Sequence, residues 1–248
     1  MALRGSKVLP SAVAVGVGAS FAWWVWRRLS DKLAARVTLR GLGDLQGEVT
    51  DGITRFLAVP FASAERWRPP VPPTPWAGRR SNPHVLPRCP QPPTDFGDPK
   101  HTLSGHTIQE TEDCLVLNVY SPDLTPKGQL APIIFYIHGG AGKLGDCHRS
   151  SFSGQELAKQ QGAVYVACNY RLGALGYLAH PALSAEDEAA PEDVPYGCGC
   201  YGILDIIAAL KFVRAHGASF GGDPNNVTIW GLSTGAQFVG HLDHRQRA

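Results

Sequence analysis

The sequence predicts an α/β fold, with a central, mostly parallel sheet and flanking helices, from two features of its second half. Residues 133–137 and 163–168 are continuous apolar runs, which are typical of strands buried on both faces of a sheet. Between them, residues 155–161 have the composition of a short helix. Apolar strands that alternate with helical segments are the pattern of a sheet covered by helices.

The first 36 residues form a separate segment. Residues 8–26 are an apolar run that Arg4 and Lys7 precede and that Arg27 and Arg28 follow. This pattern predicts an N-terminal signal anchor or a cleaved signal peptide over residues 1–36, with an organellar transit peptide as the third alternative. We favour an anchor with membrane association through residues 8–26, because no small-residue cleavage site ends the run. The excess of basic residues after the run favours a cytosolic face for the rest of the chain.

The remaining elements follow in order. Residues 37–61 contain short β-prone pieces separated by glycines, which predict small hairpins. Residues 60–99 are rich in proline and are expected to be irregular. Further strands are expected at 115–120 and 226–230, a solvated acidic loop at 184–193, and an amphipathic helix over 203–213 that ends near Gly217.

Composition excludes several classes of function. The chain has 248 residues, of which 44% are apolar, and a formal net charge of +2. A basic stripe interleaved with aromatic residues is missing, so no nucleic-acid partner is expected. The six cysteines form no CxxC pair, so neither a metal site nor a cofactor is expected.

The strongest chemical motif is the pentapeptide at residues 231–235, which reads Gly-Leu-Ser-Thr-Gly. It fits the G-x-S-x-G elbow, in which a strand turns sharply into a helix and exposes a nucleophilic serine, here Ser233. An ordinary strand-to-helix turn is the alternative. The β-prone residues before the motif and the helix-compatible residues after it favour the elbow.

A second motif, His-Gly-Gly-Ala-Gly at residues 138–142, directly follows an expected buried strand. Small residues at this place allow backbone N–H groups to converge on an oxyanion, and Gly140, Ala141 and Thr234 are the expected donors. A phosphate-binding loop is the alternative, but Walker spacing is missing. We expect His138 to brace this loop by hydrogen bonding rather than to act as a base.

Further motifs occur in a fixed order from about residue 37 to about residue 240. They are Pro60-Phe61-Ala62, Arg66-Trp67-Arg68-Pro69-Pro70, Glu112-Asp113-Cys114-Leu115 with Leu117-Asn118-Val119, Asn169-Tyr170-Arg171-Leu172-Gly173, Gly202-Ile203-Leu204-Asp205 and the run from Phe220 to Thr228. With the glycine loop and the elbow, this series resembles the type-B carboxylesterase/cholinesterase family.

The resemblance implies an α/β-hydrolase fold over residues 37–248 and hydrolysis of small-molecule esters through an acyl-enzyme. It also implies a disulfide between Cys89 and Cys114, which would favour a lumenal or secreted location over a cytosolic one. Structural ion pairs are expected between Arg66 and Glu112 and between Arg171 and Asp205.

Three departures from the family pattern limit what can be carried over. Leu232 occupies a position that is acidic in many relatives, and Gly142 replaces an aromatic residue. Phe96 is the only Phe, Tyr or Trp between Cys89 and Cys114, so choline esters are not expected as substrates.

A fourth departure concerns the acid and histidine of the family's triad, which relatives supply from beyond the elbow. Only thirteen residues follow Gly235 here, and His241, Asp243 and His244 would lie along the helix that leaves the elbow. The chain is therefore expected to be an amino-terminal fragment, incomplete on its C-terminal side and inactive alone. The alternative function is a non-catalytic binding or adhesion module on the same fold.

Overall fold

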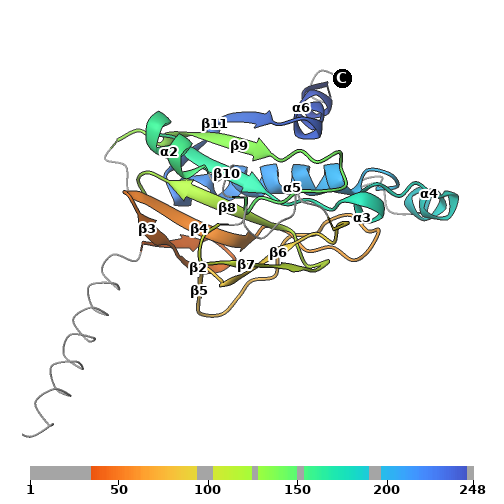
Figure 1. The fold of residues 1–248 in the computed structure, drawn as a ribbon, viewed down its shortest axis with the longest axis horizontal. Helices are drawn as coiled ribbons and strands as arrows, with labels where there is room; N and C mark the ends of the chain where they lie inside the picture. The colour runs from red at the N-terminus through yellow and green to blue at the C-terminus, as the bar shows by residue number, and fades with distance from the viewer. Residues whose placement is uncertain (1–34, 94–102, 125–127, 150–153, 190–196, 245–248) are drawn as a thin grey trace, which may run out of the picture. The chain divides into compact units, whose positions relative to one another are not determined.

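A computed structural model of the chain describes residues 35–93, 103–124, 128–149, 154–189 and 197–244. Within them, a six-stranded sheet lies at the centre (Figure 1). Its strands, in spatial order, are β11 (Gly222–Gly231), β9 (Ala131–Ile137), β10 (Val164–Cys168), β8 (Val116–Ser121), β4 (Ile53–Pro60) and β3 (Glu48–Thr50). The strands expected from the apolar runs are therefore confirmed.

The central sheet is mixed rather than mostly parallel over the described strands. Parallel pairing joins β9 to β10 and to β11, whereas the pairs β10–β8, β8–β4 and β4–β3 are antiparallel. The parallel part contains the strands that helices separate in the sequence, since one of the described α-helices lies between β9 and β10, and three lie between β10 and β11. The α/β fold class itself is confirmed.

Two smaller sheets and a set of helices complete the fold. One small sheet contains β1 (Arg36–Leu39), β2 (Gly43–Gln46) and β5 (Arg79–Ser81), and the other contains β6 (Val85–Arg88) and β7 (Thr107–Glu110). The helices are α2 (Gln155–Gln161), α3 (Gly173–Tyr177), α4 (Pro181–Glu188), α5 (Tyr201–His216), the 3₁₀ turn η4 (Gly217–Phe220) and α6 (Thr234–His244). The hairpins expected near the start of the domain are present as β1–β2 and β3–β4.

Each face of the central sheet has its own apolar core, because side chains alternate along every strand. On one face, Phe135 and Val166 pack in a cluster that includes Ile206 and Phe212 of α5. On the other face, one tyrosine from each of β8, β9 and β10 packs in a cluster with Ala158 of α2; these are Tyr120, Tyr136 and Tyr165. Helices on both faces therefore bury a sheet that is apolar on both sides, as the continuous apolar runs predict.

The prediction of a loop over the acidic residues 184–193 is wrong for its first half, because residues 181–188 form helix α4. Pro181 occupies the first helical turn, where its missing N–H costs nothing, and the His180 ring accepts the Ala182 N–H at 3.2 Å. Asp187 accepts the backbone N–H groups of Gly197 and Cys198 at 2.9 and 2.7 Å. The His180 cap and the Asp187 contacts are polar interactions that a search for apolar periodicity does not detect.

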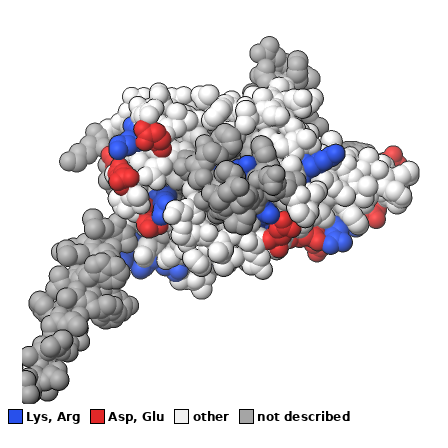
Figure 2. All heavy atoms as spheres, in the orientation of Figure 1, with Lys and Arg blue, Asp and Glu red and all other residues white. Residues whose placement is uncertain are grey.

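The predicted anchor over residues 8–26 lies outside the described residues. Across the residues that the structure describes, no helix is both long enough and apolar enough to span a membrane. On the face shown in Figure 2, lysines and arginines lie among aspartates and glutamates and form no basic stripe.

The disulfide predicted between Cys89 and Cys114 is absent from the structure, in which all six cysteines are free. Both thiols are buried, and Cys89 Sγ accepts the Leu172 N–H at 3.1 Å. A hydrogen bond to Cys89, together with burial, raises the pKa of the Cys114 thiol. The two side chains are thus satisfied as neighbouring thiols without a covalent bond.

Both predicted ion pairs are present, but they differ in burial. Arg66 pairs with Glu112 at the surface, where the two side chains are 55% and 40% exposed. Arg171 instead makes a two-pronged contact with Asp205 at 2.8 and 2.7 Å, and these side chains are 4% and 0% exposed. Burial raises the pKa of Asp205, and the hydrogen bonds from Arg171 oppose this shift.

Arg171 also joins the irregular proline-rich region to the sheet. Its Nη1 donates to the backbone oxygens of Glu65 and Arg68 at 3.2 and 2.8 Å. Asp205 lies on α5 and accepts the Arg171 backbone N–H at 3.0 Å. One buried guanidinium therefore connects the segment after β10, helix α5 and residues 65–68.

Replacing Arg171 with methionine should lower the free energy of unfolding by about 3–5 kcal/mol, because the Asp205 carboxylate would stay buried without its partner. Urea unfolding of the 248-residue chain measures the change. Arg66→Met is the matched control and should leave the urea midpoint nearly unchanged, since its pair is exposed. Equal midpoints for the two variants would contradict this account.

Candidate active site

Ser233 lies at the junction between β11, which ends at Gly231, and α6, which begins at Thr234. Its backbone has a φ of 54°, in the left-handed region that residues with a side chain seldom adopt. Its carbonyl oxygen accepts the N–H groups of Ala236 and Gln237 at 2.9 and 3.2 Å, which begins the helix. The strained, exposed serine at a strand-to-helix corner is the geometry expected from the G-x-S-x-G motif.

The loop that follows β9 lies against this corner. Since β9 and β11 are parallel neighbours, their carboxyl ends meet at the same edge of the sheet. A Cβ atom on Gly139 would lie 2.5 Å from the Leu232 carbonyl oxygen and 3.1 Å from Ser233 Cβ. On the other side of the corner, a Cβ atom on Gly235 would lie 2.1 Å from the Ile137 carbonyl oxygen. Only glycine permits these two backbone approaches.

The three expected oxyanion donors have unused amides. Among the described residues, the backbone N–H groups of Gly140, Ala141 and Thr234 donate to no acceptor. Gly140 and Ala141 have φ values of 119° and 57°, and the Gly140 carbonyl oxygen accepts the N–H groups of Lys143 and Leu144. In this tight turn the Gly140 carbonyl oxygen is used in hydrogen bonds within the loop. The backbone N–H groups of the loop remain available to a ligand.

Two cavities adjoin the elbow. One, of about 260 Å³, is lined by Ser233, Gly140 and Ala141 together with His138, Leu232, Arg149 and neighbouring residues. The other, of about 540 Å³, is lined by Ala141 and Thr234 together with Lys143, Tyr177 and Phe238. The structure thus gathers Ser233, Gly140 and Ala141 around one space, and Thr234 faces the adjoining space that shares Ala141.

His138 is held in the loop as a neutral side chain. Its Nδ1 donates to the Gly139 carbonyl oxygen at 2.8 Å, and its ring stacks on Tyr170 with the centroids 4.2 Å apart. Burial lowers the pKa of His138 to about 4. A buried imidazole with this pKa is a weak base at neutral pH. The geometry therefore agrees with a structural role in which His138 braces the loop.

Gln91 is a loop brace that the sequence analysis missed. Its side-chain amide makes a reciprocal pair with Gly145, accepting the N–H at 2.9 Å and donating to the carbonyl oxygen at 3.1 Å. Tyr170 adds a second brace, since its hydroxyl donates to the His138 carbonyl oxygen at 2.7 Å. A lone glutamine in a proline-rich segment has no sequence pattern that marks this contact, which joins residues 54 positions apart.

A buried polar network continues from the loop into the sheet. Asn118 of β8 donates to the Cys147 carbonyl oxygen at 2.9 Å and to His148 Nδ1 at 3.0 Å. His148 Nε2 in turn donates to the Pro87 carbonyl oxygen at 2.9 Å. Asn169 accepts the Cys147 N–H at 2.8 Å and donates to the same Pro87 oxygen at 2.9 Å. Because these buried groups satisfy one another, the segment after the glycine loop has a fixed path.

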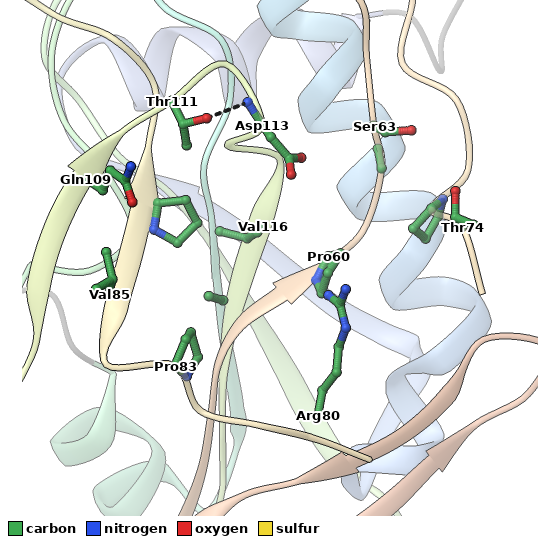
Figure 3. A pocket seen from close by; sticks show the side chains of 14 residues that line it. Pro60, Ser63, Thr74, Arg80, Pro83, Val85, Gln109, Thr111, Asp113 and Val116 are labelled. Carbon is green, nitrogen blue, oxygen red and sulfur yellow. Dashed lines mark hydrogen bonds between the residues drawn. The ribbon is translucent and has the colours of Figure 1, made fainter. Parts of the chain in front are cut away.

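A further cavity, of about 440 Å³, lies over β4 and the strands β6–β8 (Figure 3). Its charged side chains are Arg80 and Asp113, and the Asp113 N–H donates to Thr111 Oγ1 at 3.2 Å. Neither Ser233 nor the glycine loop lines it, so the elbow cavities are the better candidate for chemistry.

The described residues contain no histidine in position to act as a strong base for Ser233. His241 lies on α6, about 12 Å along the helix from Ser233 at 1.5 Å per residue, and its side chain is exposed. Asp243 and His244 lie still further along the same helix. Within the described ranges, no three His, Cys, Asp or Glu side chains form a group that could hold a metal ion.

Comparisons with known proteins identify the family and the fold. The model of the carboxylesterase family matches residues 34–246. The chain is 36% identical to fumonisin B1 esterase of Sphingopyxis macrogoltabida over 96% of its own length and 45% of that relative. It is 38% identical to human carboxylesterase 3 over 75% of its length and 31% of that relative. A solved carboxylesterase of Geobacillus stearothermophilus superposes with a TM-score of 0.67 at 34% identity, over 83% of this chain and 40% of that one.

The chain thus spans less than half the length of these relatives. Its fold, its elbow and the match over residues 34–246 together show that it belongs to the carboxylesterase family.

Proposed function

We propose that this chain carries the nucleophile and the oxyanion site of a serine carboxylic-ester hydrolase that acts on small-molecule esters. The observation that carries the proposal is the approach of Gly139 to Ser233, which brings unused amides beside the serine. The esterase names of the relatives support the same class of reaction.

In the proposed reaction, Ser233 Oγ attacks the ester carbonyl carbon and transfers its proton to a base. The resulting oxyanion accepts the N–H groups of Gly140, Ala141 and Thr234, each of which would contribute about 10²–10³-fold to the rate. Collapse of the tetrahedral intermediate releases the alcohol and leaves an acyl-Ser233 ester. Attack by water on this acyl group then releases the carboxylic acid and restores the serine.

The base in this scheme comes from outside the described residues. His138 is too weak a base because burial lowers its pKa to about 4, and His241 lies two turns along α6. A serine without a general base is a poor nucleophile. We therefore propose that the 248-residue chain has no turnover by itself.

The first prediction concerns Ser233. A fluorophosphonate probe should label the 248-residue chain slowly at Ser233, because an elbow and oxyanion site without a base retain part of their reactivity. Added imidazole should accelerate labelling by serving as an external base. Mass spectrometry of the digested protein identifies the labelled residue.

Two variants control this experiment. Ser233→Ala should remove the label, and Ser81→Ala, at an exposed serine on β5, should keep it. Equal labelling of Ser233→Ala and the unchanged chain, or no imidazole dependence, would refute the nucleophile assignment and would favour the non-catalytic binding module.

The second prediction concerns the loop. Gly139→Ala should slow Ser233 labelling at least about 100-fold, the loss expected for one oxyanion donor, because the added Cβ would push the loop away from Leu232. Gly240→Ala is the matched control, since nothing lies within 4 Å of its Cβ position. Labelling rates at a fixed imidazole concentration compare the two, and circular dichroism checks that both variants fold. Unchanged labelling of a folded Gly139→Ala variant would argue against the oxyanion site.

The third prediction concerns turnover. Without imidazole, the 248-residue chain should hydrolyse 4-nitrophenyl butyrate no faster than its Ser233→Ala variant, because no base of adequate pKa faces Ser233 in the described residues. Absorbance of released nitrophenolate measures this. Turnover that disappears in Ser233→Ala would show that a base within the chain serves this serine.

A further inference from the structure

Two histidines stand side by side at the start of the small sheet that the neighbouring strands β6 and β7 form (Figure 1). His84 precedes Val85, the first residue of β6, and His106 precedes Thr107, the first residue of β7. The centroids of the two imidazole rings lie 6.3 Å apart, and the ring planes are inclined by 33°. Two imidazoles are thus close together in a part of the fold that the candidate active site does not use.

The pairing of β6 with β7 brings the two side chains to the same face of this sheet. The strands are parallel, with Val85 opposite Thr107 and Arg88 opposite Glu110. The Thr107 N–H donates to the His84 carbonyl oxygen at 3.0 Å, so the ladder extends to the histidines. Arg88 Nη2 donates to Glu110 Oε1 at 2.8 Å, which shows that opposite side chains contact each other across the strands. Each histidine precedes a member of that pair by an even number of positions, so the histidines face the same side.

The half-buried His106 ring is oriented by a hydrogen bond to the backbone. Its Nδ1 donates to the Pro83 carbonyl oxygen at 3.0 Å, since a carbonyl oxygen can only accept. The neutral ring therefore carries its lone pair on Nε2. The His106 N–H donates to the carbonyl oxygen of the buried Leu103 at 3.2 Å, which fixes the backbone of this turn. Metal-binding histidines have the same arrangement, in which one ring nitrogen donates to a backbone carbonyl and the other binds the ion.

His84 differs from His106 in being exposed, so its ring can turn about its side-chain bonds. Metal–nitrogen bonds of about 2.0–2.1 Å to each ring fit within the 6.3 Å centroid separation once the exposed ring turns toward its neighbour. One oriented imidazole and one adjustable imidazole can therefore bind the same ion.

We propose that His84 and His106 form a binding site for one divalent transition-metal ion, with water in the remaining coordination positions. Imidazole nitrogen suits Cu²⁺, Ni²⁺ and Zn²⁺, whereas Mg²⁺ and Ca²⁺ prefer oxygen ligands. Within the described ranges, no third His, Cys, Asp or Glu side chain joins the pair in a group that could hold a metal ion, so the site is an open two-histidine site. The bound ion ties the start of β6 to the start of β7, which are far apart in the sequence.

Calorimetric titration of the 248-residue chain with NiCl₂, in the absence of any affinity tag, tests the proposal. Cysteine thiolates also bind metal ions, and Cys198 and Cys200 are only half-buried. The titration therefore uses a parent chain with both Cys198→Ser and Cys200→Ser. One Ni²⁺ ion per chain should bind at the histidine pair, and Mg²⁺ at the same concentration should not bind there.

Variants of this parent chain assign the binding to residues. His84→Ala and His106→Ala should each weaken Ni²⁺ binding at least about tenfold, because even the loss of an outer partner of a metal ligand costs about 10–100-fold. His241→Ala, at an exposed histidine of α6, is the matched control and should bind Ni²⁺ as the parent chain does. Circular dichroism checks that the variants fold, and the exposed His84→Ala variant decides the proposal if His106→Ala does not fold.

A second readout is the urea midpoint of unfolding. An ion that binds the folded chain stabilises it, so the midpoint should rise with Ni²⁺ concentration in the parent chain and in His241→Ala, but not in His84→Ala. Absence of Ni²⁺ binding to the parent chain, or binding and stabilisation that His84→Ala leaves intact, overturns the metal site.

Discussion

The site depends on one steric constraint, which is the contact between the end of β11 and the loop that follows β9. Gly139 lies against the Leu232 carbonyl, and Gly235 lies against the Ile137 carbonyl, at separations that exclude any side chain. Parallel pairing of β9 with β11 brings these two backbone segments to the same edge. The left-handed φ of Ser233 costs about 1–3 kcal/mol, and it persists because the packed strand and helix leave the corner no alternative path.

The surrounding polar network maintains that contact. Gln91 and Tyr170 hold the ends of the glycine loop, and Asn118 and His148 hold the residues that follow it. Arg171 with Asp205 connects the proline-rich region to α5. Buried polar groups of this kind contribute modest net stability but fix one arrangement, since an unpaired member would be costly. The glycine-loop amides that we propose as oxyanion donors are thereby held in one position.

Much of the fold and of the candidate site could be predicted from the sequence, because the informative signals were local. Apolar runs identified β9 and β10, and glycine spacing identified the elbow and its facing loop. The contacts of Gln91 and the cap of α4 could not be predicted, since they join polar atoms without a periodic pattern. The expected disulfide between Cys89 and Cys114 came from the family resemblance alone, and the structure contains two buried free thiols there. The sheet is mixed because β8 pairs with β10 across long sequence separations, which local patterns do not encode.

The most direct measurement of the central claim is a crystal structure of the chain with Ser233 phosphonylated. The phosphonyl oxygen stands for the oxyanion of the proposed tetrahedral intermediate. The account predicts that this oxygen lies about 2.7–3.1 Å from the backbone nitrogens of Gly140, Ala141 and Thr234. A phosphonyl oxygen directed to solvent, with the glycine loop displaced from the elbow, would contradict it.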